Sequence, residues 1–137
     1  MGTRSLTYVY DSKVESKPRK IINMYRQFDG YPSGHGAELA EFLNSFDAIV
    51  NGYAIDEKRK VANGMGCLAA QLVSEFKDGV GGFYLYPTTS KDCGQDYEYY
   101  VYEDKVIVKE AGWGKYRAKK LFEGSWKDFQ TFCNSQE

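Results

Sequence analysis

The sequence predicts an α+β fold, in which a mainly antiparallel β-sheet carries two or three helices packed on one side. Strand-like alternation of apolar residues dominates both halves of the chain, two helical stripes lie between these strand runs, and a third helical stripe ends the chain. Because strands and helices come in separate runs, regular βαβ units are not expected. With 137 residues, of which 42% are hydrophobic and 27% charged, the chain suits a single globular domain over residues 1–137.

The first two strands form a hairpin. Residues 5–10 alternate in hydropathy, the charged segment 11–20 is an exposed loop, and residues 21–28 return as the second strand. This alternation puts Arg26 among apolar residues on one side of the second strand. Arginine is rarely buried without a partner, so the position is unusual.

Two helices follow the hairpin. A turn-rich segment, 29–36, leads into the first, and the second covers about residues 63–77. Residues 47–60 between them are expected to form an irregular connection. The first helix has an apolar stripe at the spacing i, i+3, i+4, i+7, which consists of Leu39, Phe42, Leu43 and Phe46.

The second half is mostly strand. The predicted strands are 83–86, 97–102, 106–110 and 116–122. A final helix begins after Ser125, because Ser125 and Asp128 have the spacing of a capping box.

Charge and composition narrow the function classes. The 18 Lys and Arg residues against 19 Asp and Glu give a net charge of −1, whereas a duplex-DNA-binding protein normally carries a basic excess. No apolar run is long enough for a transmembrane helix and no secretion signal is readable, so we expect no membrane partner. The 3 cysteines have no close spacing, which predicts neither a disulfide framework nor a metal site and fits a reducing cytoplasm. We expect no cofactor.

Both predicted helices open with the pattern Gly-x-Gly, at residues 34–36 and 64–66. The unpaired N–H groups of a helix start bind phosphate, and glycine lets a ligand approach the backbone closely. The same glycines equally serve tight turns and close helix packing, so both interpretations stay open.

Three arginines are candidate phosphate ligands, because a guanidinium can hold phosphate oxygens through two parallel hydrogen bonds. They are Arg4, Arg26 and Arg117. For each, the alternative is an ion pair with a carboxylate such as Asp29, Glu38 or Glu41.

His35 is the only histidine and is a candidate ligand contact or general base. A catalytic role needs partners, and no hydrolase or metalloprotease motif surrounds it. A histidine beside a helix start is also commonly a surface or capping residue, so this alternative remains.

Aromatic residues make up 16% of the chain, with 12 tyrosines among them. Phe83 and Tyr99 lie next to the loop 88–96 and are candidates for stacking a nucleobase. Asp92, in that loop, is a candidate for binding ribose hydroxyls or a base edge. Core packing or a subunit interface explains such aromatic residues equally well.

Four segments carry a family resemblance: GTRSLT at 2–7, MYRQFDGYPSGHG at 24–36, NGMGCLAA at 63–70 and GGFYLYP at 81–87. In these segments, in its length and in its order of strands and helices, the chain resembles the first-described class of phage Thoeris anti-defence proteins. The resemblance implies a protein that sequesters the glycocyclic ADP-ribose messenger of bacterial TIR-domain defence proteins and leaves it intact. Some members also hold cyclic trinucleotides, and members assemble as dimers grouped into hexamers.

The resemblance also assigns individual residues. Phe83 matches the aromatic residue that faces the nucleotide. The polar loop residue of the family falls near Asp92, where this sequence has Asp in place of the expected Asn. Arg26 and Arg117 fit the role of phosphate ligands but do not align with particular family residues.

The resemblance therefore implies a non-enzymatic homo-oligomer, a dimer or hexamer, in the cytoplasm of an infected bacterial host. Its expected ligand is a cyclic ADP-ribose-type or cyclic oligonucleotide messenger. One alternative is an enzyme that cleaves a cyclic nucleotide, with His35 as the base and Arg26 on the phosphate. The other is an inhibitor whose tyrosine-rich face blocks a host enzyme.

Overall fold

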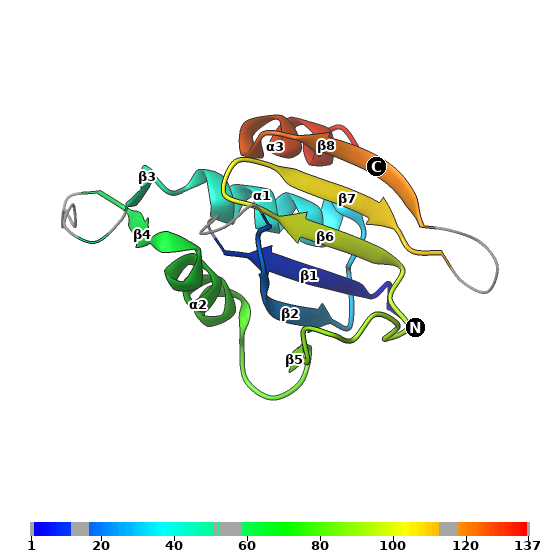
Figure 1. The fold of residues 1–137 in the computed structure, drawn as a ribbon. Coiled ribbons are helices and arrows are strands. Elements are labelled where there is room, and N and C mark those ends of the chain that lie inside the picture. The colour runs from blue at the N-terminus through cyan, green and yellow to red at the C-terminus, as the bar shows by residue number, and fades with distance from the viewer. Residues whose placement is uncertain (1, 12–16, 51, 53–58, 113–117, 137) are drawn as a thin grey trace.

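The computed structural model describes residues 2–11, 17–50, 52, 59–112 and 118–136. In this part of the chain, the main body is a six-stranded sheet with three α-helices packed on one face, as Figure 1 shows. The predicted α+β class is confirmed. None of the helices in the described residues has both the length and the hydropathy that crossing a bilayer requires.

The strands of the sheet lie in the order β5-β2-β1-β6-β7-β8. They are β1 (Ser5–Tyr10), β2 (Lys20–Arg26), β5 (Phe83–Tyr86), β6 (Tyr97–Val101), β7 (Val106–Glu110) and β8 (Lys119–Gly124). All neighbours pair antiparallel except β1 and β6, which run parallel at the centre of the sheet. This parallel pair and the antiparallel pair of β2 with β5 join the two halves of the chain into one sheet.

The helices are α1 (Ala37–Asn44), α2 (Gly64–Phe76) and α3 (Trp126–Asn134). A π-helical turn, Pro32–Gly36, precedes α1. The predicted cap of α3 is confirmed, since the Asp128 N–H donates to Ser125 Oγ at 3.1 Å. Apolar residues of all three helices form the main core with strand residues such as Val9 and Val108.

The second strand is shorter than the predicted range 21–28. It ends at Arg26, because the chain turns away at Asp29, whose φ of 55° is left-handed. Phe28 thereby leaves the sheet, and its side chain is 42% exposed.

The segment 47–60 was expected to be irregular, and this prediction is wrong at its beginning. The strand β3 (Ala48–Val50) pairs in parallel with β4 (Val61–Asn63) and forms a separate two-stranded sheet. A strand of three residues is too short to show alternation, so the sequence pattern gave no signal for it.

The two faces of the main sheet bury different residues. One face, which we call the helical face, carries the main core. The other, which we call the open face, has no helix over it in the described residues and holds a small second core of Leu6, Tyr8 and Tyr25. Tyrosine rings pair across strands on this face, and those of Tyr10 and Tyr102 stack with their centroids 4.4 Å apart.

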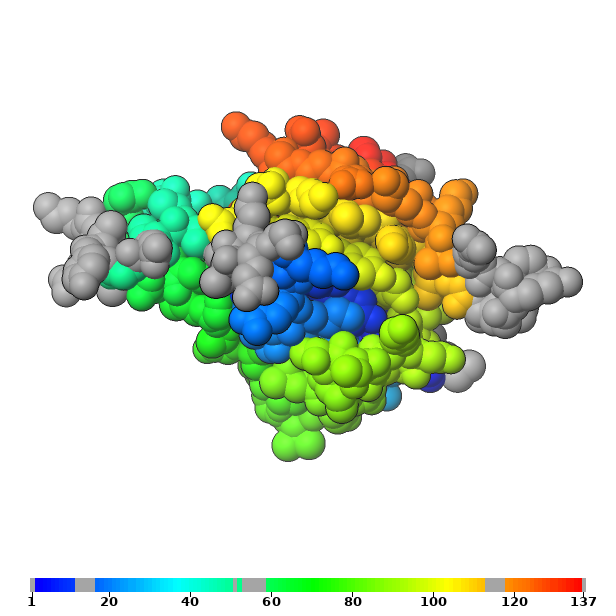
Figure 2. Space-filling view, in the orientation of Figure 1, coloured from blue at the N-terminus to red at the C-terminus, as the bar shows by residue number. Residues whose placement is uncertain are grey.

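The segment after β5 covers one end of the open face. Its yellow-green atoms lie beside the blue atoms of β1 and β2 in Figure 2. Asn23 of β2 reaches this segment, and its side-chain amide donates to the carbonyl of Pro87 at 3.2 Å and to that of Ser90 at 3.3 Å.

Candidate functional site

A cavity of about 600 Å³, which we call the pocket, opens on the helical face. It lies between α1, the end of α2 and the loop that leads into β5. The phenylalanine rings that line it, among the described residues, are Phe28, Phe42, Phe76 and Phe83. A volume of this size suits a ligand as large as a nucleotide.

Charged side chains stand among these rings. The carboxylates of the described lining are Glu38, Glu41, Glu75 and Asp78, and its cations are Arg26 and Lys60. Four carboxylates against two cations give this lining an acidic excess of two charges. The pocket therefore favours hydrogen-bond donors, and an anion finds attraction only beside the cations.

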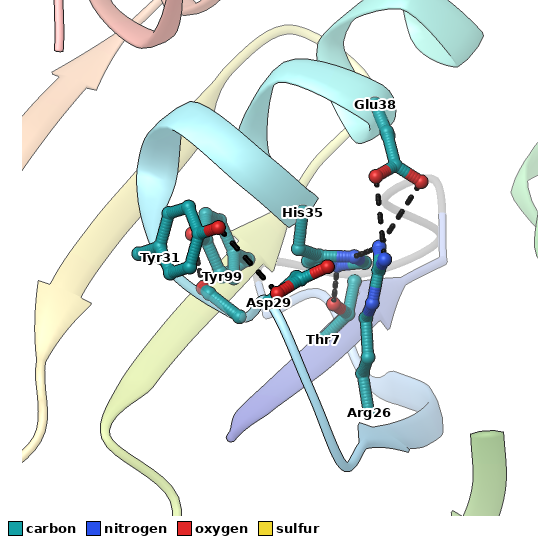
Figure 3. Close-up of polar contacts among 8 residues, drawn as sticks. Thr7, Arg26, Asp29, Tyr31, His35, Glu38 and Tyr99 are labelled. Atoms are coloured by element: carbon teal, nitrogen blue, oxygen red, sulfur yellow. Dashed lines mark hydrogen bonds and ion pairs between the residues drawn. The ribbon is translucent and has the colours of Figure 1, made fainter. Parts of the chain in front are cut away.

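Arg26 is held from several sides, as Figure 3 shows for its polar partners. Its Nη1 and Nη2 donate to the two carboxylate oxygens of Glu38 at 3.1 and 3.2 Å, and Nη1 also donates to His35 Nδ1 at 3.2 Å. The guanidinium carbon lies 4.9 Å from the ring centroid of Phe28 and 5.0 Å from that of Phe83. Arg26 is only 4% exposed, so these contacts fix a desolvated cation in the pocket wall.

His35 lies behind Arg26 and is completely buried. Because a guanidinium only donates, His35 Nδ1 is the acceptor, which places the ring proton on Nε2, where it is donated to Thr7 Oγ1 at 2.7 Å (Figure 3). Burial, with a contribution from the nearby Arg26 charge, lowers the pKa of His35 to about 3. The imidazole is therefore neutral at physiological pH.

A glycine-rich loop, residues 78–82, forms the wall beside β5. Gly81 and Gly82 have left-handed φ angles of 81° and 76°, which side-chain-bearing residues rarely adopt. The ammonium group of Lys77 donates to the carbonyls of Gly81 and Phe83 at 2.9 and 2.8 Å. These bonds tie the loop to the first residue of β5.

Two of the predicted site residues meet in the pocket. Arg26 and Phe83 come from neighbouring strands, in direct register, and both line the cavity. The ion pair of Arg26 with Glu38, which the sequence left open as the alternative to phosphate binding, is present.

Two other predicted residues lie behind the pocket wall. His35 and Tyr99 are both 0% exposed, and the Tyr99 hydroxyl donates to the carbonyl of Gly30 at 2.7 Å. Neither side chain has a surface that a ligand reaches in this arrangement, which places both as supports of the wall and not as contacts. Both ring nitrogens of His35 have protein partners, so the ring is not available as a general base here.

Arg4 and Asp92 do not line the pocket. Arg4 precedes β1, and its backbone N–H donates to the carboxylate of Asp96 at 2.9 Å. Asp92 is exposed and accepts a hydrogen bond from the Gly94 N–H at 3.1 Å, which shapes its own loop. Arg117 lies outside the described residues.

The Gly-x-Gly patterns differ from each other. A Cβ atom at Gly36 would lie 2.9 Å from Cys133 Sγ, so this glycine serves close packing against α3. Around Gly64 and Gly66 a Cβ would meet no atom within 4 Å, and Gly64 has a φ of 80°. Gly64 therefore serves the turn into α2.

Most of the residues that line the pocket were not predicted from the sequence. Phe28 was expected on a strand face, and Phe76 and Lys60 were assigned no function. These residues come from distant segments whose meeting depends on how α1 and α2 pack on the sheet, and no motif marks them.

Metal-binding chemistry has no site in the part of the chain that is described, where no three His, Cys, Asp or Glu side chains gather as ligands. No family model matches the chain, and neither a curated protein nor a solved structure does. The geometry of the pocket therefore carries the functional argument.

Proposed function

We propose that this protein binds a cyclic ADP-ribose-type messenger in the pocket and holds it unchanged, so that the host's anti-phage defence is not activated. The observation that supports this most is that an aromatic ring, Phe83, and a buried guanidinium, Arg26, line the same cavity of about 600 Å³. Stacking surface and phosphate-binding group are the two elements that a nucleotide pocket needs.

Each part of such a ligand has a chemical counterpart in the lining. An adenine ring stacks on Phe83 or Phe28, which contributes about 1–3 kcal/mol. Glu41 and Glu75 accept hydrogen bonds from ribose hydroxyls, and the diphosphate lies at the end of the pocket that holds Arg26. The acidic excess disfavours highly charged ligands, so a cyclic dinucleotide-like compound fits better than a longer oligonucleotide.

The proposed mechanism is mass action without catalysis. His35 is buried and neutral with both nitrogens bonded, which favours holding over cleavage. To silence a signal, the protein needs a nanomolar affinity, or about −12 kcal/mol. The prior fixation of Arg26 reduces the ordering that binding requires. In this proposal the protein acts as a homo-oligomer in the cytoplasm of the infected host.

Release of the ligand tests holding against cleavage. The protein is incubated with cyclic ADP-ribose, denatured by heat, and the released compound is analysed by mass spectrometry. We expect the intact messenger, and a linear product would instead support the enzyme. In a thermal shift assay, ligand at about 100 times its Kd adds roughly 2.7 kcal/mol of stability, several degrees for a chain of this length.

Two neighbouring residues of β5 locate the site. Phe83 faces the pocket, whereas Tyr84 faces the open side and is 43% exposed. We expect Phe83→Ala to weaken binding by about 1–3 kcal/mol and Tyr84→Ala to leave it unchanged. Equal affinities for the two variants would exclude the pocket as the site.

A second candidate function is an inhibitor that binds a host protein. It is favoured by exposed apolar side chains at the β5 end of the molecule, where Val80 is 106%, Leu85 56% and Tyr84 43% exposed. Absence of a thermal shift with every nucleotide tested would favour this function.

A further inference from the structure

The geometry points to Glu38 as a built-in competitor: its carboxylate takes the anion-binding edge of Arg26, and a ligand phosphate binds by displacing it. The inference rests on the proposed function, because it names how the same pocket exchanges one anion for another. It makes Glu38, and not only Arg26, a residue that determines which anions the pocket accepts.

The two partners differ in how firmly they are held. The Arg26 side chain is 5% exposed, with Phe28 and Phe83 on its guanidinium and His35 behind it, whereas the Glu38 side chain is 55% exposed. Within the described residues, the hydrogen bonds of the Glu38 carboxylate are those to Arg26. Glu38 is therefore the partner that moves when the pair opens, and Arg26 stays in the pocket wall.

The charges around Arg26 determine how strongly Glu38 competes with an incoming anion. His35 is neutral, and in the described part of the chain no carboxylate other than that of Glu38 forms an ion pair with Arg26. An incoming anion therefore meets one tethered carboxylate at high effective concentration. A singly charged anion competes poorly against it, whereas a diphosphate brings more charge and more oxygens.

Glu38 occupies the edge of the guanidinium that a ligand would use. It accepts from Nη1 and Nη2, while Nε of Arg26 is buried without a hydrogen-bond partner among the described residues. Because Nε is buried, a phosphate binds Arg26 through Nη1 and Nη2 and takes the place of the carboxylate there.

The test compares Glu38→Gln with Glu41→Gln, using ADP-ribose and inorganic pyrophosphate as probes in isothermal titration calorimetry. Both variants remove one negative charge from the lining of the pocket, but of these two carboxylates only that of Glu38 forms an ion pair with Arg26 in the described residues. The Glu38→Gln substitution keeps the size of the side chain and one acceptor oxygen. We expect Glu38→Gln to bind the probes about tenfold tighter than the wild type, and Glu41→Gln to gain only about twofold.

The outcomes separate this inference from the proposed function. If the wild type binds the probes and the two variants gain the same affinity, the pocket remains the binding site but displacement of Glu38 is contradicted. If neither the wild type nor a variant binds either probe, both proposals are overturned. NMR of the wild type gives a second measurement that needs no variant: pyrophosphate should shift the Glu38 carboxylate carbon and the Arg26 Nε–H signal together, and a shift of Arg26 without Glu38 would contradict displacement.

Discussion

Polar side chains differ in burial and bonding between the helical face and the open face of the sheet, although the residues of the two faces alternate along the same strands. On the helical face, Arg26 and His35 are buried and bonded to protein partners. On the open face, lysines lie over tyrosine rings, with the ammonium group of Lys109 4.9 Å from the ring centroid of Tyr100. Lys109 and Tyr100 remain half-buried, so water shares in their solvation.

This contrast shows what a covering helix does to a polar group. Once helices exclude water, each donor and acceptor needs an internal partner, and losing that partner costs more than it does on a face that water reaches. The helical face therefore holds a preorganised site, whereas the half-buried part of the open face around Tyr100 and Lys109 tolerates change. Paired measurements on the two faces test this contrast.

The largest difference is expected between two cations. Arg26→Ala removes a buried guanidinium, leaves His35 Nδ1 without its donor and opens a cavity beside Phe83. We expect it to lower the free energy of unfolding by about 3 kcal/mol, measured by urea denaturation. Lys109→Ala, on the open face, should cost about 0.5 kcal/mol or less. Similar losses for both variants would remove the distinction between the faces.

The pH dependence of stability gives the next effect. The pKa of His35 is about 3 in the folded protein, below its value of about 6.5 in the unfolded chain, so between these values the unfolded chain binds more protons. The free energy of unfolding therefore decreases as the pH falls below about 6.5. The decrease is about 1.4 kcal/mol per pH unit and reaches about 2–3 kcal/mol by pH 4.5.

Urea denaturation at pH 7 and pH 4.5 measures this loss, and a His35→Gln variant provides the control, because it should lose less stability over the same range. Equal acid sensitivity of the wild type and His35→Gln would show that His35 is not the group responsible.

The open face loses stability at high pH instead. Burial, the largest cause, raises the pKa of Tyr8 to about 12. The contribution of Tyr8 to stability is therefore present below about pH 10 and lost as the pH rises toward 12.

The smallest difference is expected between adjacent tyrosines of β6 that face opposite sides. The Tyr99 hydroxyl donates to the buried carbonyl of Gly30 at 2.7 Å, and the Tyr100 hydroxyl donates to Glu98 at 2.6 Å. Tyr99→Phe should cost about 2 kcal/mol, because the carbonyl of Gly30 loses its donor in the dry core. Tyr100→Phe should cost about 1 kcal/mol, since Glu98 keeps its bond from Gln95. If thermal unfolding showed a larger loss of stability for Tyr100→Phe than for Tyr99→Phe, the expected difference between the two faces would be contradicted.

The fold could be predicted further than the site. Alternation along β1, β5 and β7 and the capping box of α3 are local patterns, and the structure has them at the predicted residues. The parallel pairing of β1 with β6 could not be read locally, because these strands come from opposite halves of the chain. It depends on which strands meet when the helices cover the sheet.

The site residues divide in the same way. The sequence marked Arg26 as unusual from its apolar neighbours, and it offered an ion pair with Glu38 as one alternative. It also offered His35 and Tyr99 as candidate ligand contacts beside structural alternatives, because a residue type and its neighbours do not report burial. Packing of helices on the sheet, with Phe76 of α2 against His35 and Phe129 of α3 against Tyr99, leaves both side chains out of reach of solvent.

Spacing along a few neighbouring residues was enough to predict the α+β class, most strand and helix positions and the side of its strand on which Arg26 lies. Which rings and carboxylates share the pocket, and which polar groups are buried, became visible only in the packed chain. Those properties depend on the exclusion of water between segments distant in the sequence, and no local pattern encodes that exclusion.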